Sequence, residues 1–138
     1  MEQQDFEIKM KHLDIIQGVI TRMNINSFSM KGWMITIVAA FLAVFAASND
    51  LNELYLFMAI IPTLLFWILD SHYLQIEKKY RSLFEDVRLD NVIGLSMDVS
   101  RYNVSFIGVL FSKTEWPLYL ITITVLCVGG IMGCYGVY

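Results

Sequence analysis

Few residues in this sequence have the types and spacing that catalysis or metal binding requires. Asp70 and His72 form an Asp-x-His pair, but no third ligand follows at helical spacing, so the pair does not define a metal site. His12, the other histidine, lies in a charged segment and is expected to be a solvated surface residue. Cys127 and Cys134 stand too far apart along one helix to form a disulfide. The sequence also contains no glycine-rich phosphate loop, nucleophile elbow or zinc motif, so we expect no enzymatic activity and no cofactor.

The composition of the chain points to a membrane instead. Of its 138 residues 57% are apolar, a larger share than in ordinary soluble domains, and only 17% are charged, a smaller share. The excess is concentrated in three blocks without charged side chains, at 33–47, 54–69 and 117–138. The third block reaches the roughly 20 residues that a helix needs to cross a bilayer, and the first two reach it with a few flanking residues each. Three buried helices of a soluble bundle are the weaker alternative, because such helices normally keep a polar face.

The predicted fold class is therefore an all-α integral membrane protein with three transmembrane helices. An N-terminal amphipathic helix and a cytoplasmic extension of the second span complete it. Four segments follow along the chain: a cytoplasmic amphipathic helix (1–28), a transmembrane helical hairpin of spans one and two (29–70), a cytoplasmic helix with a connector (71–116), and a third transmembrane helix (117–138).

The distribution of basic residues predicts the orientation of these spans. Lysine and arginine gather in the segment before span one and in the segment between spans two and three, whereas residues 48–53 contain none. Because basic residues are enriched on the cytoplasmic side, we expect a multi-pass protein with a cytoplasmic N-terminus and a periplasmic C-terminus.

The N-terminal segment carries an apolar seam at helical spacing. Its members are Phe6, Leu13, Ile16, Ile20 and Met23. Such a seam packs against another helix, either of a second copy or of the same chain, or lies flat on the membrane. Asparagine and serine side chains within 24–29 bond to their own backbone, so the helix is expected to end there and span one to begin afresh.

Span two is expected to continue as one helix from about residue 53 to residue 88, with a kink at Pro62. Residues 89–111 fit either a short hairpin or an interfacial stretch. The pattern from Ser112 to Glu115 matches a capping box, and Pro117 is tolerated in the first turn of a helix, so span three should start there.

Asp70, Thr36 and Thr63 are the candidates for a pore or gate. A charge at the bilayer centre is costly, so Asp70 is expected at the inner interface. There it either contributes to a ring of carboxylates at a pore mouth or forms a helix-orienting ion pair with Lys31 or a neighbouring chain's Lys78. The two threonines either line a polar path or bond to the carbonyl four residues earlier in their own helix.

Small residues predict self-association. Ala39, Ala43 and Ala47 recur every fourth residue in span one, and Gly129 and Gly133 have the same spacing in span three. Small residues at this spacing let helix backbones approach closely in lipid. Two such surfaces exceed what one compact monomer needs, so we expect a homo-oligomer with cyclic symmetry, taken here as a tetramer.

A group of basic and aromatic residues in the cytoplasmic segments is the candidate ligand or signal site. Arginine beside aromatic rings suits phosphates and bases, and contact with lipid headgroups is the alternative interpretation. The group comprises Arg22, Lys31, Lys78, Lys79, Arg81, Arg88, Arg101, Tyr73 and Tyr80.

The motif R-M-N-x-N-S-F-x-x-K-G-W at 22–33 is followed by Pro62 and by F-W-x-L-D at 66–70. Over roughly residues 20–90, these motifs resemble small bacterial membrane proteins associated with anti-phage defence, of the Hailong-like membrane effector type. One departure is Glu77-Lys78, where the family pattern has Glu-Arg.

The resemblance implies a homo-oligomeric channel in the bacterial inner membrane, opened by a cytoplasmic nucleotide or nucleic-acid signal. Opening would depolarise the cell. Its implied partners are membrane lipid, further copies of itself, and a nucleotidyltransferase-like protein or its oligonucleotide product. The residue pattern alone also permits a membrane anchor or scaffold that recruits a soluble partner through its cytoplasmic helices, or a subunit of a larger membrane complex.

Overall fold

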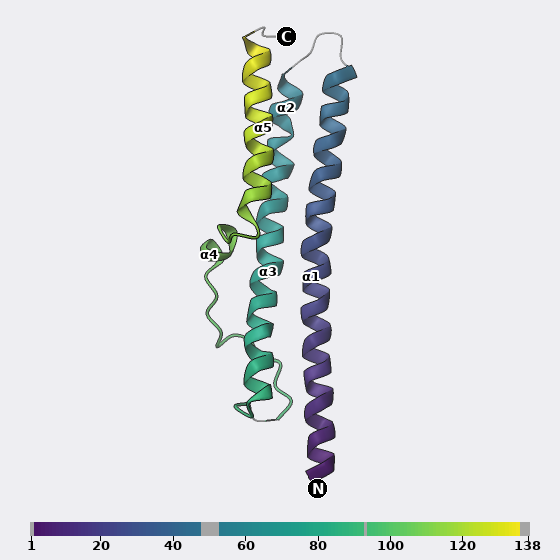
Figure 1. Ribbon diagram of the computed structural model, residues 1–138, viewed down its shortest axis with the longest axis vertical. Coiled ribbons are helices and arrows are strands. Elements are labelled where there is room, and N and C mark those ends of the chain that lie inside the picture. The colour runs from purple at the N-terminus through teal and green to yellow at the C-terminus, as the bar shows by residue number, and fades with distance from the viewer. Residues whose placement is uncertain (1, 48–52, 93, 136–138) are drawn as a thin grey trace.

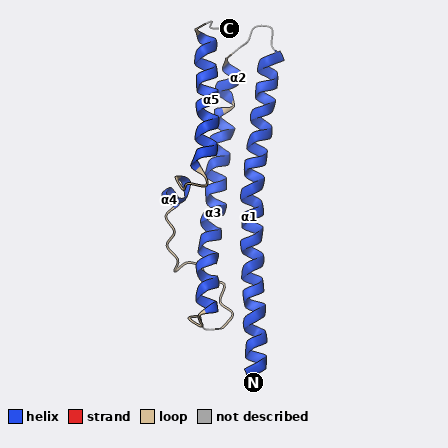
Figure 2. Cartoon of the chain, in the orientation of Figure 1, coloured by secondary structure: helices blue, strands red, loops and turns tan. Residues whose placement is uncertain are grey.

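The computed structural model of the chain describes residues 2–47, 53–92 and 94–135, and all regular structure within these ranges is helical (Figures 1 and 2). The helices in chain order are α1 (Glu2–Ala47), α2 (Leu54–Met58), α3 (Ile60–Arg88), α4 (Phe106–Leu110) and α5 (Trp116–Cys134). The all-α prediction is therefore confirmed for the described residues.

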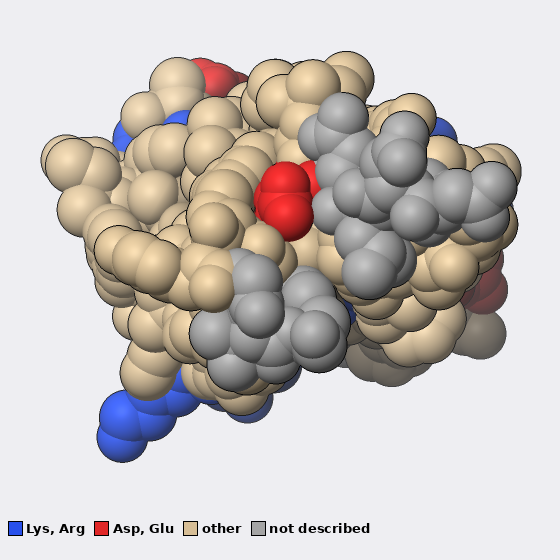
Figure 3. Space-filling model, turned by 90° about the horizontal axis from the view of Figure 1, so that it is seen from above, with Lys and Arg blue, Asp and Glu red and all other residues tan. Residues whose placement is uncertain are grey.

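Three stretches of the described chain are long and apolar enough to cross a membrane, as predicted. They lie in α1, in α2 together with α3, and in α5. In Figure 1, α1 and α3 run side by side along the long axis, and α5 lies beside α2 and the adjoining part of α3. Figure 3 looks down on the end of the bundle where α5 finishes. Most of this face is neither acidic nor basic, with a small acidic patch near its centre and other charged groups at its rim.

Helix α1 is continuous, and the predicted break within 24–29 is wrong. The polar side chains that were expected to end the helix have other partners. Ser29 Oγ donates to the carbonyl of Ile25 at 2.8 Å, a bond that leaves the helix intact. Ser27 Oγ donates to the Asp70 carboxylate of α3 instead of capping its own backbone. The N-terminal segment and the first apolar stretch are thus a single rod of 46 residues, roughly 70 Å long.

The second span is interrupted once, at Ala59 between α2 and α3. Pro62 has no N–H with which to bond the carbonyl of Met58, and its ring crowds the preceding turn. Bonds from Ala59 N to the carbonyl of Tyr55 (3.2 Å) and from Thr63 N to the carbonyl of Ala59 (3.4 Å) carry the chain across the break. Beyond it, α3 continues to Arg88, as the predicted extension requires, while its cytoplasmic location stays a prediction.

The bundle divides into a charged half and an apolar half. We define the charged half as residues 2–31 of α1, residues 70–88 of α3 and the connector 89–115. The apolar half comprises the remaining parts of α1 and α3 together with α2 and α5.

The core of the charged half lies between α1 and α3. Ile16 and Ile20 pack against Leu83 and Val87, and all four side chains are buried. Part of the connector covers this core with Val92, Met97, Val99 and Tyr102. Three arrangements were open for the N-terminal seam, and in this structure it packs against α3 of the same chain. Phe6, at the far end of the seam, stays 62% exposed.

The core of the apolar half joins all of its helices. Its buried members are Met34, Val38, Leu56, Ala59, Tyr119 and Leu126. Helix α5 approaches α2 closely at Gly130, where an added Cβ would lie 2.7 Å from the Phe57 ring. The glycine surface predicted from sequence is therefore at least partly used within the chain.

The connector 89–115 is formed by turns and the short helix α4, and no strand occurs in its described residues, so the hairpin alternative is wrong. Asp90 reverses the chain after α3 with a φ of 61°. Ser105 Oγ caps α4 by accepting from the N–H of Gly108 at 3.3 Å. Figure 1 shows α4 projecting to the side of the bundle, close to where α5 begins.

Two neighbouring isoleucines of α1 test the core of the charged half. Ile16 is fully buried, and Ile15 is 56% exposed. Replacing Ile16 with alanine should lower the free energy of unfolding by about 2–5 kcal/mol, because it leaves a cavity in the core. Ile15→Ala should change it by only about 0.5 kcal/mol. Loss of helical circular dichroism in detergent measures both, and equal effects would contradict this packing.

Candidate functional site

A buried carboxylate, Asp70, lies where α1, α3 and α5 meet. Its side chain is fully buried and is surrounded by polar partners. Ser27 Oγ of α1 donates to Oδ1 at 2.5 Å, and Tyr119 Oη of α5 donates to Oδ2 at 2.8 Å. Lys31 Nζ of α1 lies 2.6 Å from the same Oδ2. The sequence offered Lys31 as one of two possible ion-pair partners, and the structure pairs it with Asp70.

A second carboxylate shares the same lysine. Glu115 is 1% exposed, and its Oε1 and Oε2 atoms accept from Lys31 Nζ at 3.0 and 3.1 Å. Lys31 Nζ also lies 3.1 Å from Ser27 Oγ. One ammonium group therefore serves two buried carboxylates. We call Ser27, Lys31, Asp70, Glu115 and Tyr119 the junction cluster, because it lies between the charged and apolar halves.

Glu115 reaches the junction cluster because the predicted capping box does not form. Its side chain makes no cap bond at the start of α5, and turns to Lys31 of α1 instead. Within the described residues Ser112 Oγ is buried without a hydrogen-bond partner, and Ser112 meets the start of α5 through its carbonyl, which accepts from Glu115 N at 2.9 Å and from Trp116 N at 3.2 Å. The capping-box prediction is therefore wrong, because the charged lysine is a stronger partner for the carboxylate than a backbone amide.

Aromatic rings support the cluster from its apolar side. Trp67 stacks on Tyr119 with centroids 5.8 Å apart and contacts Phe111 edge-on at 5.7 Å. Trp67 Nε1 also donates to the carbonyl of Leu110 at 3.1 Å. These contacts fix α4 and the end of the connector against α3, and so hold Glu115 close to Lys31.

Burial changes the acidity of the cluster. Withdrawal from water, followed by contact with the Asp70 carboxyl group, raises the pKa of Glu115 to about 7. Lys31 acts in the opposite direction but does not cancel these effects. Glu115 is thus a weak acid that titrates close to neutral pH.

The other two pore or gate candidates, Thr36 and Thr63, form no hydrogen bond to the junction cluster among the described residues. Thr63 is fully buried, and its hydroxyl donates to the carbonyl of Ala59 at 2.8 Å. Thr36 is exposed, and its hydroxyl donates to the carbonyl of Gly32 at 2.9 Å. Both hydroxyls therefore bond to the carbonyl four residues earlier in the chain, which is one of the two arrangements expected for these threonines.

Most of the candidate signal-binding cations already have carboxylate partners. Arg81 pairs with Glu77 at 2.6 Å, Arg88 with Glu85 at 2.7 Å, and Arg101 with Asp86 at 3.0 Å. No ion pair within the described residues involves Arg22, Lys78 or Lys79. Tyr73 and Tyr80 are half-buried, and Tyr80 packs on the core of the charged half. The electrostatic field of this surface is therefore weaker than its basic residues suggest.

Three of these candidates meet at an open pocket of about 420 Å³ beside the junction cluster. Lys31, Lys78 and Arg81 line it together with the acidic residues Glu77 and Glu115. The remaining basic candidates do not line this pocket. Because its lining carries both signs of charge, the pocket gives an anion little net attraction.

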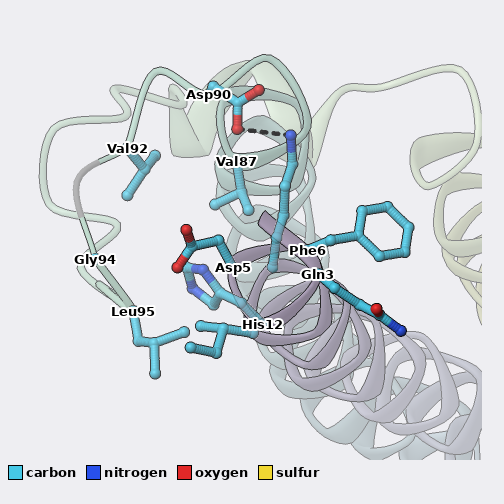
Figure 4. Close-up of a pocket in the computed structure, with 11 residues that line it drawn as sticks. Gln3, Asp5, Phe6, His12, Val87, Asp90, Val92, Gly94 and Leu95 are labelled. Carbon is cyan, nitrogen blue, oxygen red and sulfur yellow. Dashed lines mark hydrogen bonds and ion pairs between the residues drawn. The ribbon is translucent and has the colours of Figure 1, made fainter. Parts of the chain in front are cut away.

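A larger pocket of about 760 Å³ lies at the far end of the charged half (Figure 4). Lys9 spans one side of it and pairs with Asp90 at 2.6 Å. His12 lines the pocket but is only 3% exposed, and its Nε2 lies 3.0 Å from the carbonyl oxygen of Ser96. The expectation of a solvated His12 is wrong, because the connector folds over α1 and covers the ring. Figure 4 shows Leu95 beside it on the connector.

Sequence reasoning missed three members of the junction cluster as site residues, Ser27, Glu115 and Tyr119. The signal that could have found Glu115 is its place immediately before an apolar span, where an acid needs a cationic partner. Searches of protein-family models, curated proteins and solved structures gave no match to the chain.

Replacing Asp70 tests whether the junction cluster holds the helices together. Asp70→Ala removes one partner from a buried ion pair and should lower the free energy of unfolding by about 3–5 kcal/mol. The exposed acid Glu85 pairs with Arg88, and its replacement by alanine should cost at most about 1 kcal/mol. Thermal unfolding in detergent compares the two, and a similar small loss for both would contradict a structural role for the cluster.

Proposed function

We propose that this chain is a homo-oligomeric effector of the bacterial inner membrane. Its spans form an ion channel or pore, and its charged half lies in the cytoplasm, where a nucleotide or nucleic-acid signal controls it during anti-phage defence. The role in defence and the type of signal come from the resemblance over residues 20–90. The geometry bears on how such a protein would assemble and respond.

The observation that carries the proposal is the continuity between the two halves. Helix α1 runs from Glu2 to Ala47 without a break, and α3 runs from Ile60 to Arg88. A helix is a stiff element, so a displacement of its charged end also displaces its apolar end. Binding of a signal to the charged half could therefore move the membrane spans without any separate transmitting domain.

Self-association is supported by the surface of α1 that remains open. Ala39, Ala43 and Ala47 are exposed, in contrast to Gly130, which is buried against α2. Small residues drive close packing of helices in lipid, where apolar burial contributes little. The alanine face is thus available to a second copy, and a ring of such contacts would enclose a path between subunits.

A scaffold that recruits a soluble partner is the second candidate, and exposed apolar side chains favour it. Phe6, Ile15, Ile25 and Phe28 of α1 are all more than half exposed in the charged half. Exposed apolar groups of this size mark interaction surfaces. Under this alternative, deletion of residues 2–23 would abolish co-purification of the partner.

Bulk added to the alanine face tests self-association. Ala39→Leu combined with Ala43→Leu should shift the protein from oligomer to monomer, because the larger side chains keep the helix backbones apart. Val125 is 60% exposed on α5, and Val125→Phe adds bulk on that helix, outside the alanine face, as a control that should leave the oligomer intact. Native mass spectrometry in detergent measures both. An unchanged oligomer in the double variant would contradict assembly through this face.

The channel itself is tested in cells with a voltage-sensitive dye. Asp70→Ala removes a contact that ties α3 to α1 and α5, and should favour an open state that collapses the membrane potential. Glu85→Ala removes only an exposed ion pair with Arg88, and should leave the membrane potential unchanged. Cell death with an unaltered dye signal would remove the channel proposal, and recruitment of a partner would then be the better account.

A further inference from the structure

The junction cluster contains more negative than positive charge. The side chains of Asp70 and Glu115 are 0% and 1% exposed, and they share one ammonium group, Lys31, whose side chain is 20% exposed. If both acids were ionised, a net negative charge would remain in a site largely withdrawn from water. Such a charge is strongly disfavoured unless another cation neutralises it.

No other cation meets the Glu115 carboxylate within the described residues. Arg81 lines the adjoining pocket, but it is committed to Glu77 at 2.6 Å. Lys78 lines the same pocket without an ion pair to Glu115. The charged and titratable groups that face Glu115 are Lys31 of α1, Asp70, Glu77, Lys78 and Arg81 of α3, and Tyr119 of α5.

The hydrogen bonds decide which of the two acids takes up a proton. Asp70 accepts from the hydroxyls of Ser27 and Tyr119 and also faces Lys31, and donors to a carboxylate stabilise its ionised form. Among the described residues of the cluster, Glu115 accepts from Lys31 alone, and it lies against the Asp70 carboxyl group. Glu115 also lines the open pocket of about 420 Å³, through which water can reach it.

We propose that Glu115 is a proton-binding site. In the proton-loaded state, the Glu115 hydroxyl donates to the Asp70 carboxylate while its carbonyl oxygen accepts from Lys31. The proton comes from water in the pocket, and the cluster as a whole becomes neutral. Glu115 immediately precedes Trp116, the first residue of α5, so gain or loss of this proton changes how firmly α5 is held to α1. This site would operate whether or not the chain conducts ions.

The direction of the pH dependence follows from the acidity of Glu115. Burial raises the pKa of this group from 4.5 to about 7, so the folded chain binds the proton more tightly than the unfolded chain. The contribution to stability is greatest below the ordinary pKa. It decreases as the pH rises and is lost above about pH 7.

The proton can be observed directly in the wild-type protein in detergent. Infrared difference spectra should contain the carbonyl band of a protonated carboxyl group near pH 6 that disappears by about pH 8. Glu115→Gln should lack this band. Absence of the band in the wild type, or its persistence in Glu115→Gln, would overturn the proposal.

Thermal unfolding provides the second measurement. The melting temperature of the wild type should fall between about pH 5 and about pH 9, and Glu115→Gln should lose that fall because glutamine imitates the neutral acid. Glu85→Gln changes an exposed glutamate that pairs with Arg88, and should keep the wild-type profile. All three proteins keep every other residue unchanged, so the comparison isolates the substituted glutamate.

A metal cation in the pocket is the competing way to neutralise the cluster. Replacing Na⁺ by K⁺ or by a large organic cation at constant ionic strength should leave the midpoint of the infrared titration unchanged. A midpoint that depends on the identity of the cation would show that a metal ion occupies the site, and would overturn the assignment of Glu115 to proton binding alone.

Discussion

The arrangement of the three long helices depends on the contacts of Lys31. This one ammonium group bonds to Asp70 of α3 and to Glu115 at the start of α5, and so links α1 to both. Moving α1 away from α3 would leave the buried Asp70 carboxylate without its cation, which is more costly than losing an apolar contact of the same size. The apolar cores on either side hold the helices together, but apolar packing tolerates sliding and rotation. The polar contacts are directional and fix one register of the three helices.

The same contacts explain why a charge can lie so close to an apolar segment. A single acid or base at the edge of a bilayer gains by turning toward water or by finding a partner. Lys31 and Asp70 lie opposite one another on adjacent helices, and Trp67 and Tyr119 cover them from the apolar side. The cluster is thus shielded from lipid and largely withdrawn from water, which reaches it through the open pocket beside Glu115.

The sequence predicted the parts of this structure that depend on local composition. Three uncharged blocks were enough to locate the apolar stretches, and the absence of helix breakers after Pro62 predicted the length of α3. Predictions failed where a side chain has to choose between a local and a distant partner. Glu115 fits a capping box, and Ser27 fits a helix end, but each bonds to a residue far away in the chain, 84 positions in the case of Glu115 and Lys31. His12 is buried by the connector for the same reason. Such choices depend on tertiary geometry, which the pattern of a single segment does not contain.

The unbroken course of α1 has a consequence for how this chain can vary in length. Each residue added to an α-helix turns everything beyond it by about 100°. Ile16 and Ile20 must face Leu83 and Val87 while Lys31 faces Asp70, and one rigid rod carries both sets of contacts. After a single insertion between Ile20 and Ser27, either the isoleucine contacts or the Lys31 contact could form, but the other would point away from α3. Changes of length here are tolerable only in near-integral numbers of turns, and only if α3 changes by the same amount.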